Sequence, residues 1–293
     1  PDGLGRPRVR LGEPGDGAVH YEEPRGTGGE RRPGIVLRSL SDGERLVWPW
    51  MERTTVLHES VPGHHVHVGA HATSTRLTAW QRYLGSVAGC DEGWGLYAES
   101  LADELGLMPT PEDRFGRLAA RRWRLARGLV DLGVHSRLPV PDDVAALPGA
   151  CREWSRATVT AVLRHHTVIS EGRLRFEVSR HLGWPAQPLA YAVGERVWQA
   201  GRRSAQAQAR AEGGELDLRA FHNRGIDLGS VGLERFALTC TKDAEGIGAR
   251  SFVGRASGFS GAAALAGTCS LPGLGNQEPA GNKSAATCTN ACG

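Results

Sequence analysis

The stretch that decides the fold is His58-Glu59-Ser60-Val61-Pro62-Gly63-His64-His65, in a chain with 11 histidines overall. A Glu beside a histidine, with a second histidine four residues after the first, is typical of zinc-peptidase helices, because both imidazoles then reach one metal ion. Here the residue four positions after His58 is Pro62. The usual motif is therefore interrupted, and the second histidine of a metal site must come from further along the chain.

The interruption itself suggests which histidine this is. In an unbroken helix of 100° per residue, His64 would point ~120° away from His58, and His65 would lie ~10 Å further along the axis. Pro62 cannot donate to the carbonyl of His58, and Gly63 permits the dihedrals of a bulge. We expect a bulge at Pro62-Gly63 to return His64 to the position of a ligand. We favour His64 over His65. His65 stays open as the alternative ligand or as a residue that supports a ligand without binding the metal.

A third ligand is expected from the segment Glu92-Gly93-Trp94-Gly95-Leu96-Tyr97-Ala98-Glu99. Its two carboxylates are seven residues apart and so share one helix face. We predict that Glu92 binds the metal and that Glu99 orients a histidine from behind. Solvated carboxylates on a polar face are the alternative interpretation.

Helical patterns account for most of the chain. One helix should begin near Trp48 or Pro49, and another, from about Asp91 to Leu105, should bury Trp94 and Tyr97. A third should run from a cap at Thr110 to about His135. Its apolar stripe comprises Phe115, Leu118, Leu125, Leu129 and Leu132. Further helices are expected within 151–180, over 188–211 and after Asp217, with a single short strand near 34–37.

These patterns divide the chain into three parts. Residues 1–47 are predicted to be loop-rich, residues 48–241 to form a mainly α domain, and residues 242–293, with ten glycines, to form a flexible tail. The fold class is therefore mainly α, with the metal site between two helices.

Composition excludes several classes of function. A formal charge of +3 is too small to indicate nucleic acid, and the arginines fall on helix faces. No stretch approaches the ~20 apolar residues that cross a bilayer.

The absence of a CxxC pair leaves the redox compartment undetermined. We favour the cytoplasm, with the expectation that an export signal is missing from a chain that begins without Met. The oligomeric state is open.

The two motifs resemble those of bacterial domain-of-unknown-function family 885, whose signatures are His-Glu-x-x-Pro-Gly-His-His and Glu-Gly-Trp-x-Leu-Tyr-Ala-Glu. The resemblance covers about residues 18–238. It continues through Arg32-Pro33-Gly34, Arg127, Val130, Asp131, Gly133, His135, Trp184-Pro185-Ala186-Gln187, Tyr191, Gly194 and Phe221-His222. It implies a helical, zinc-dependent metallopeptidase similar in its metal helices to thimet oligopeptidase and helical carboxypeptidases. In those enzymes the first Glu of an acidic helix is the third ligand, which supports Glu92.

The chain departs from this family in three ways. Family members are usually longer, with an N-terminal helical region whose loss would remove one wall of a substrate cleft. Their Tyr-Lys-x-Gly run reads Tyr191-Ala192-Val193-Gly194 here. The segment after about Cys240 matches nothing in the family.

The expected activity is zinc-dependent hydrolysis of a peptide substrate. Glu59 would be the general base, beside Zn²⁺ bound by His58, His64 and Glu92. The oxyanion needs a donor, either Tyr191 or His135, the latter with Asp131 fixing its tautomer. The plainer interpretation of Tyr191 is a buried aromatic.

Two other functions stay open. A chain without its N-terminal wall would be a non-catalytic metal-binding or scaffold protein. A remote alternative is a fused precursor of a thioether-crosslinked peptide, suggested by Thr268-Cys269-Ser270 and Thr287-Cys288-Thr289.

Overall fold

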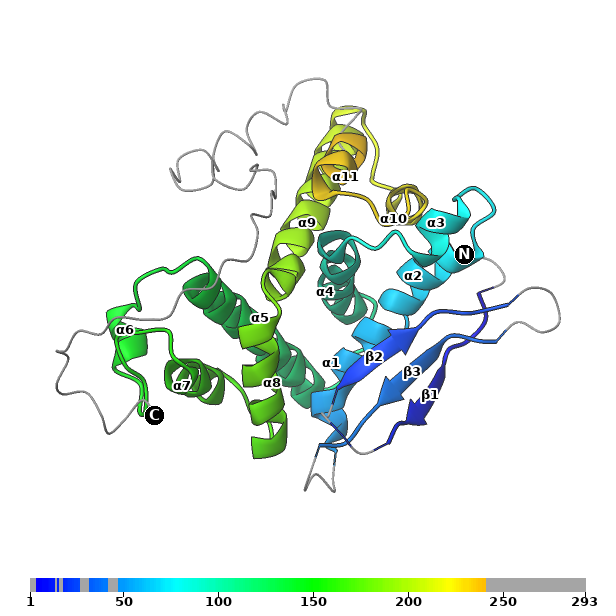
Figure 1. The fold of residues 1–293 in the computed structure, drawn as a ribbon. Helices are drawn as coiled ribbons and strands as arrows, with labels where there is room; N and C mark the ends of the chain where they lie inside the picture. The colour runs from blue at the N-terminus through cyan, green and yellow to red at the C-terminus, as the bar shows by residue number, and fades with distance from the viewer. Residues whose placement is uncertain (1–3, 14, 16–17, 27–31, 42–46, 241–293) are drawn as a thin grey trace, which may run out of the picture.

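The computed structural model of the chain describes residues 4–13, 15, 18–26, 32–41 and 47–240. The predicted tail, 242–293, lies outside these residues, as do the two Cys-containing segments considered above. Within the described residues the fold is mainly helical, as predicted, with one small sheet beside the helices (Figure 1).

The sheet is built from the N-terminal segment that the sequence predicted to be largely loop. Its strands are β1 (Arg8–Leu11), β2 (Val19–Glu22) and β3 (Ile35–Arg38), in the order β1-β3-β2. β3 pairs in parallel with β1 and antiparallel with β2. Only the central strand β3 matches the predicted strand. Each strand has four residues, and β1 is exposed throughout, so neither outer strand carries the apolar alternation that identifies a strand.

The helices follow the sheet in chain order. They are α1 (Pro49–Glu59), α2 (His64–Thr73), α3 (Ala79–Tyr83), α4 (Ala88–Glu104), α5 (Pro111–His135), α6 (Asp142–Ala145), α7 (Arg156–His166), α8 (Glu171–Gly183), α9 (Gln187–Ala211), α10 (Leu218–Ile226) and α11 (Leu233–Cys240). Thr110 caps α5, as predicted, and forms a capping box with Asp113, while Asp217 caps α10. None of these helices is long and apolar enough to cross a membrane.

Two apolar clusters hold the helices together. The first joins α4 and α9 to α10 and α11 through Trp94, Tyr97, Trp198, Phe221 and Phe236. The second joins α5 to α7 and α8 and includes Val130, Val162 and Leu174. The cleft described below opens between the sheet and these helices.

The packing of α4 on α9 depends on glycine. A Cβ on Gly93 would lie 2.4 Å from the Cα of Gly194, and a Cβ on Gly194 would lie 1.9 Å from the carbonyl oxygen of Gly89. The two helix backbones therefore touch. This contact brings the start of α9 against the start of α4, where Glu92 lies.

Most of the apolar stripe of α5 is exposed. Phe115 is 58% exposed, Leu118 56% and Leu125 47%. α5 buries the face that carries Trp123, Arg124 and Arg127. Polar side chains on this face contact the cleft and its carboxylates, so the hydrophobic pattern alone does not identify the buried face.

Candidate metal centre

The two histidines of the first motif lie on different helices. α1 ends at Glu59 and α2 begins at His64, with a turn between them that contains the cis peptide Val61–Pro62. The sequence predicted a bulge within one helix, and the structure has a complete break instead. The consequence for the imidazoles is the one expected, because the rings of His58 and His64 lie 4.7 Å apart between centroids.

Gly63 and Trp94 hold this turn in place. A Cβ on Gly63 would lie 1.8 Å from the carbonyl oxygen of His58, so only glycine fits. The indole N–H of Trp94 on α4 donates to the carbonyl oxygens of Pro62 and Gly63, both at 3.0 Å. Trp94 therefore ties α4 to the turn and sets the position of His64 relative to Glu92. The sequence predicted that Trp94 is buried but did not predict this role.

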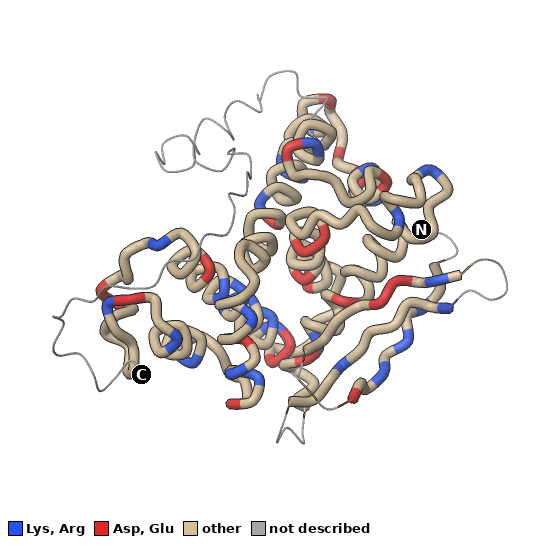
Figure 2. Tube along the Cα trace, viewed as in Figure 1, with Lys and Arg blue, Asp and Glu red and all other residues tan. Residues whose placement is uncertain are grey.

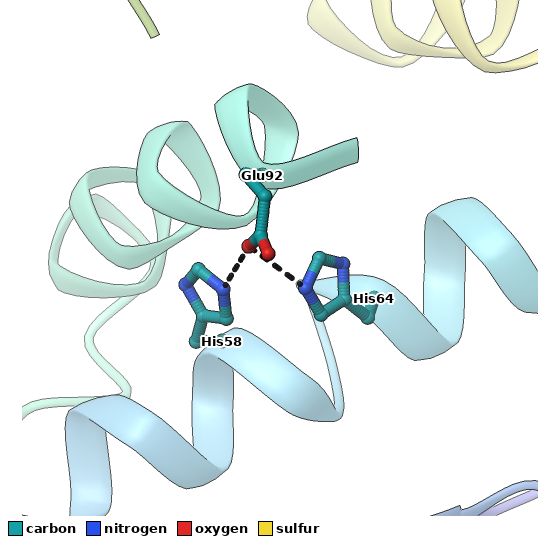
Figure 3. A group of neighbouring side chains, drawn as sticks. All are labelled: His58, His64 and Glu92. Atoms are coloured by element: carbon teal, nitrogen blue, oxygen red, sulfur yellow. Dashed lines mark hydrogen bonds and ion pairs between the residues drawn. The ribbon is translucent and has the colours of Figure 1, made fainter. Parts of the chain in front are cut away.

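Glu92 lies between the two histidines (Figure 3). Its Oε2 atom is 3.4 Å from His58 Nε2 and 3.5 Å from His64 Nε2. One ligand atom from each of the three residues lies within 4.8 Å of the others, a grouping that can hold a metal ion. Burial would raise the pKa of Glu92, but the hydrogen bonds from His58 and His64 lower it well below its usual range. Burial alone would lower the pKa of His64, but its hydrogen bond to Glu92 raises this pKa to about 9.

Glu99 lies behind His58. Its Oε1 atom is 2.8 Å from His58 Nδ1 and 2.8 Å from the guanidinium of Arg124. Burial would raise the pKa of Glu99, but the charge of Arg124 and the hydrogen bond with His58 lower it. Ionised Glu99 therefore accepts the Nδ1–H of His58 and orients the ring so that Nε2 faces Glu92.

The centre opens into a cleft of about 790 Å³ that His58, Glu59, His64, Glu92 and Tyr191 all line. Burial raises the pKa of Glu59, against the opposing charges of His64 and His58. The ring of Tyr191 stacks on that of His58 at 5.8 Å, and burial raises the pKa of its phenol. Strand β2 contributes Val19, His20 and Tyr21 to the lining, so the N-terminal sheet forms part of the wall.

Three other candidate residues lie elsewhere. His65 is buried against the sheet, with Nδ1 2.8 Å from the hydroxyl of Tyr21 and Nε2 3.0 Å from the carbonyl oxygen of Gly5. His135 is absent from the described lining of the cleft, and its Nε2 donates to the carbonyl oxygen of His181 at 2.8 Å.

Asp131 is 3.9 Å from His135 and accepts a hydrogen bond from the backbone N–H of Ala186. It therefore anchors the start of α9, the helix that carries Tyr191.

A second histidine group lies next to the first. His67 and His71, four residues apart on α2, meet Asp91 of α4 within the same 4.8 Å limit. His67 Nδ1 is 3.5 Å from Asp91 Oδ1, and His71 Nε2 donates to the carbonyl oxygen of Ile226. Neither histidine lines the cleft described above.

Comparison with known proteins identifies the family. Residues 10–237 match the family model described as "Bacterial protein of unknown function (DUF885)". The chain belongs to this family. No curated protein matches the chain.

Two solved structures are similar to this member of the family. One is a protein of Colwellia psychrerythraea, 26% identical, with a TM-score of 0.66 over 80% of this chain. The other, from Shewanella oneidensis, is 15% identical, with a TM-score of 0.54 over 78% of this chain, and shows the fold alone. Both are described as "putative" lipoproteins, the second as one of unknown function. The chain spans 38% and 39% of their lengths, respectively.

Proposed function

We propose that this chain is a zinc-dependent peptidase whose metal is held by His58, His64 and Glu92. The observation that carries the proposal is the convergence of two imidazole nitrogens on one carboxylate oxygen inside a cleft that Glu59 also lines. Two histidines and a carboxylate are the ligands of catalytic zinc in several peptidases, and they leave a coordination position open.

The ligand atoms of His58, His64 and Glu92 fit a divalent cation. With Nδ1–H of His58 held by Glu99, a neutral ring would offer the Nε2 lone pair to a cation, beside an oxygen of Glu92. His64 Nε2 faces the same oxygen, while its buried Nδ1 has no hydrogen-bond partner. Without a cation, protons on the imidazoles satisfy these contacts, and a bound cation would take their place. Ligands ~2.0–2.2 Å from one zinc ion lie ~3–4 Å from each other, which matches the observed separations of 3.4 Å and 3.5 Å.

The residues around the centre supply the rest of the chemistry. Bound zinc would lower the pKa of water and polarise the scissile carbonyl. Glu59 would accept the proton of the attacking water and deliver it to the leaving amine, and its raised pKa makes it a better base than an exposed Glu. Tyr191 would donate its phenol hydrogen to the oxyanion, because burial keeps the phenol protonated at neutral pH. His135, outside the cleft, is not part of this proposal.

The test is digestion of a peptide mixture by the zinc-loaded chain, followed by mass spectrometry. Glu59→Gln keeps the size of the side chain but removes the base, so zinc should stay and turnover should fall by ~10² or more. Glu112→Gln, an exposed position at the start of α5, is the matched control and should keep both. Zinc binding without cleavage by the parent chain would instead identify a metal-binding protein without peptidase activity.

A further inference from the structure

The wall of the cleft formed by α5 and α8 is rich in arginine. Arg124 and Arg127 of α5 and Arg173 and Arg180 of α8 all line it, whereas Glu177 is the one carboxylate of these two helices among the described lining residues. Figure 2 shows basic positions along α5 and α8, whereas acidic positions mark α4. The wall opposite the metal centre is therefore positive.

Arg127 is a buried cation whose charge faces Glu177 and the phenol of Tyr191. Its side chain is 3% exposed, and its ion pair with Glu177, at 3.9 Å, is longer than a hydrogen bond. Its Nε and one terminal nitrogen are buried without a hydrogen-bond partner. Arg180 approaches the same Glu177 at 4.0 Å, and its Nε is also without a partner. Two guanidinium groups thus share one carboxylate, which His181 already contacts at 2.8 Å.

This arrangement leaves donors for a second anion. Unsatisfied buried donors are rare in folded proteins and need an explanation. A planar guanidinium binds a carboxylate through two parallel N–H···O bonds, so the natural partner of these donors is another carboxylate. The nearby rings of Trp123 and Tyr191 lie 4.8 Å and 4.7 Å from the Arg127 guanidinium and restrict where this group can point.

Arg127 lies close to the metal centre. Arg127 contacts the Tyr191 ring at 4.7 Å, and that ring stacks on His58 at 5.8 Å. Since an extended peptide advances ~3.3–3.6 Å per residue, this span corresponds to about three residues or fewer.

We propose that Arg127 and Arg180 bind a carboxylate of the substrate within about three residues of the bond that is cleaved. The proposal rests on the peptidase function proposed above and specifies its substrate class as acidic. The carboxylate is either the C-terminus of a short peptide, which would make the chain a carboxypeptidase, or an Asp or Glu side chain.

The test measures binding and cleavage separately. Binding to the purified chain is measured by isothermal titration with acetyl-Ala-Ala-Ala-Leu, either as the free acid or as the amide. Two further amides carry Glu or Gln in place of the third alanine. The free acid should bind ~10-fold or more tighter than its amide if the C-terminus is recognised. A preference of the Glu amide over the Gln amide would identify a side-chain carboxylate.

Variants assign the preference to particular residues. Arg127→Met and Arg180→Met should each reduce it ~10-fold or more, and Arg180, which is partly exposed, serves if the buried Arg127 variant does not fold. Arg175→Met is the matched control, because Arg175 is exposed on the same helix and should not affect the preference. Equal binding of all four peptides to the parent chain would overturn the proposal.

Digestion of the same peptides distinguishes the two proposals. Cleavage of acids and amides at equal rates would refute carboxylate recognition and leave the peptidase function standing. Preferential binding of the acids without any cleavage would refute the peptidase function and support the arginine site.

Discussion

Gly95→Ala should weaken metal binding while the fold is retained, and it leaves all three proposed ligands in place. An added Cβ would lie 2.4 Å from Cε1 and 2.6 Å from Nε2 of His58. Ordinary carbon contacts lie at ~3.5–4.0 Å, so the imidazole would have to move by ~1 Å. Metal–ligand distances tolerate only ~0.2 Å, and a displaced His58 also loses its contact with Glu99.

The expected effect on metal affinity is large. Loss of a group behind a ligand costs ~10–100-fold in affinity, and displacement of the ligand itself should cost at least ~100-fold. α4 cannot relieve the clash by retreating, because Gly93 touches α9 and Trp94 holds the turn before α2. Helical content should be retained, since Ala favours helix over Gly by up to ~1 kcal/mol.

Competition for zinc with a coloured chelator measures the affinity, and circular dichroism checks the fold. Gly128→Ala is the matched control, because its Cβ would meet Leu189 at an ordinary 3.6 Å within another helix. It should keep the parent affinity. A folded Gly95→Ala chain that binds zinc as tightly as the parent would refute the assignment of His58 as a ligand.

Three further changes test the surroundings of the centre. Trp94→Phe removes the donor to two turn carbonyls, and urea unfolding should show a loss of ~1–3 kcal/mol together with weaker zinc binding. Gly194→Ala places a Cβ 1.9 Å from a backbone oxygen of α4 and should lower the unfolding free energy by ~1–3 kcal/mol or more; an unchanged urea midpoint would contradict the observed helix contact. Burial alone would raise the pKa of Glu177, but its hydrogen bond with His181 lowers this pKa to about 2. The stabilisation by ionised Glu177 is therefore present above about pH 4.5 and is lost as the pH falls through about 2. Over this range the free energy of unfolding should fall by at most ~1.4 kcal/mol per pH unit, and Glu177→Gln should remove this pH dependence.

The sequence predicted the helices well, because caps and breakers are local signals. Thr110 with Pro111 and Asp217 mark helix starts that the structure confirms. The outer strands β1 and β2 could not be predicted, since their pairing depends on β3, which is distant in sequence, and their side chains do not alternate. The exposed stripe of α5 shows the same limit, because which face of a helix is buried depends on its neighbours.

The grouping of His58, His64 and Glu92 was predicted from spacing and residue type, but its geometry was not. A bulge and a complete helix break both bring His64 beside His58, and the sequence does not distinguish between them. Burial decides the position of His65, which packs against Tyr21 of a strand that was not predicted. The role of Trp94 and the arginines opposite the centre are tertiary features, so no sequence pattern indicated them.

The tight fit of Gly63 makes one substitution less informative. Replacing Pro62 and Gly63 by Ala would appear mild for a helix bulge, but a Cβ on Gly63 would lie 1.8 Å from the carbonyl oxygen of His58. Gly63→Ala therefore disrupts the backbone of the turn as well as the position of His64. This is why Gly95, which faces only the imidazole ring, is the better position to substitute.

The most direct test of the account is the location of the metal in a crystal of the zinc-loaded chain, from anomalous scattering at the zinc absorption edge. The account predicts a peak ~2.0–2.2 Å from His58 Nε2, His64 Nε2 and a Glu92 oxygen. A peak found only among His67, His71 and Asp91, or no bound zinc at His58, would contradict it.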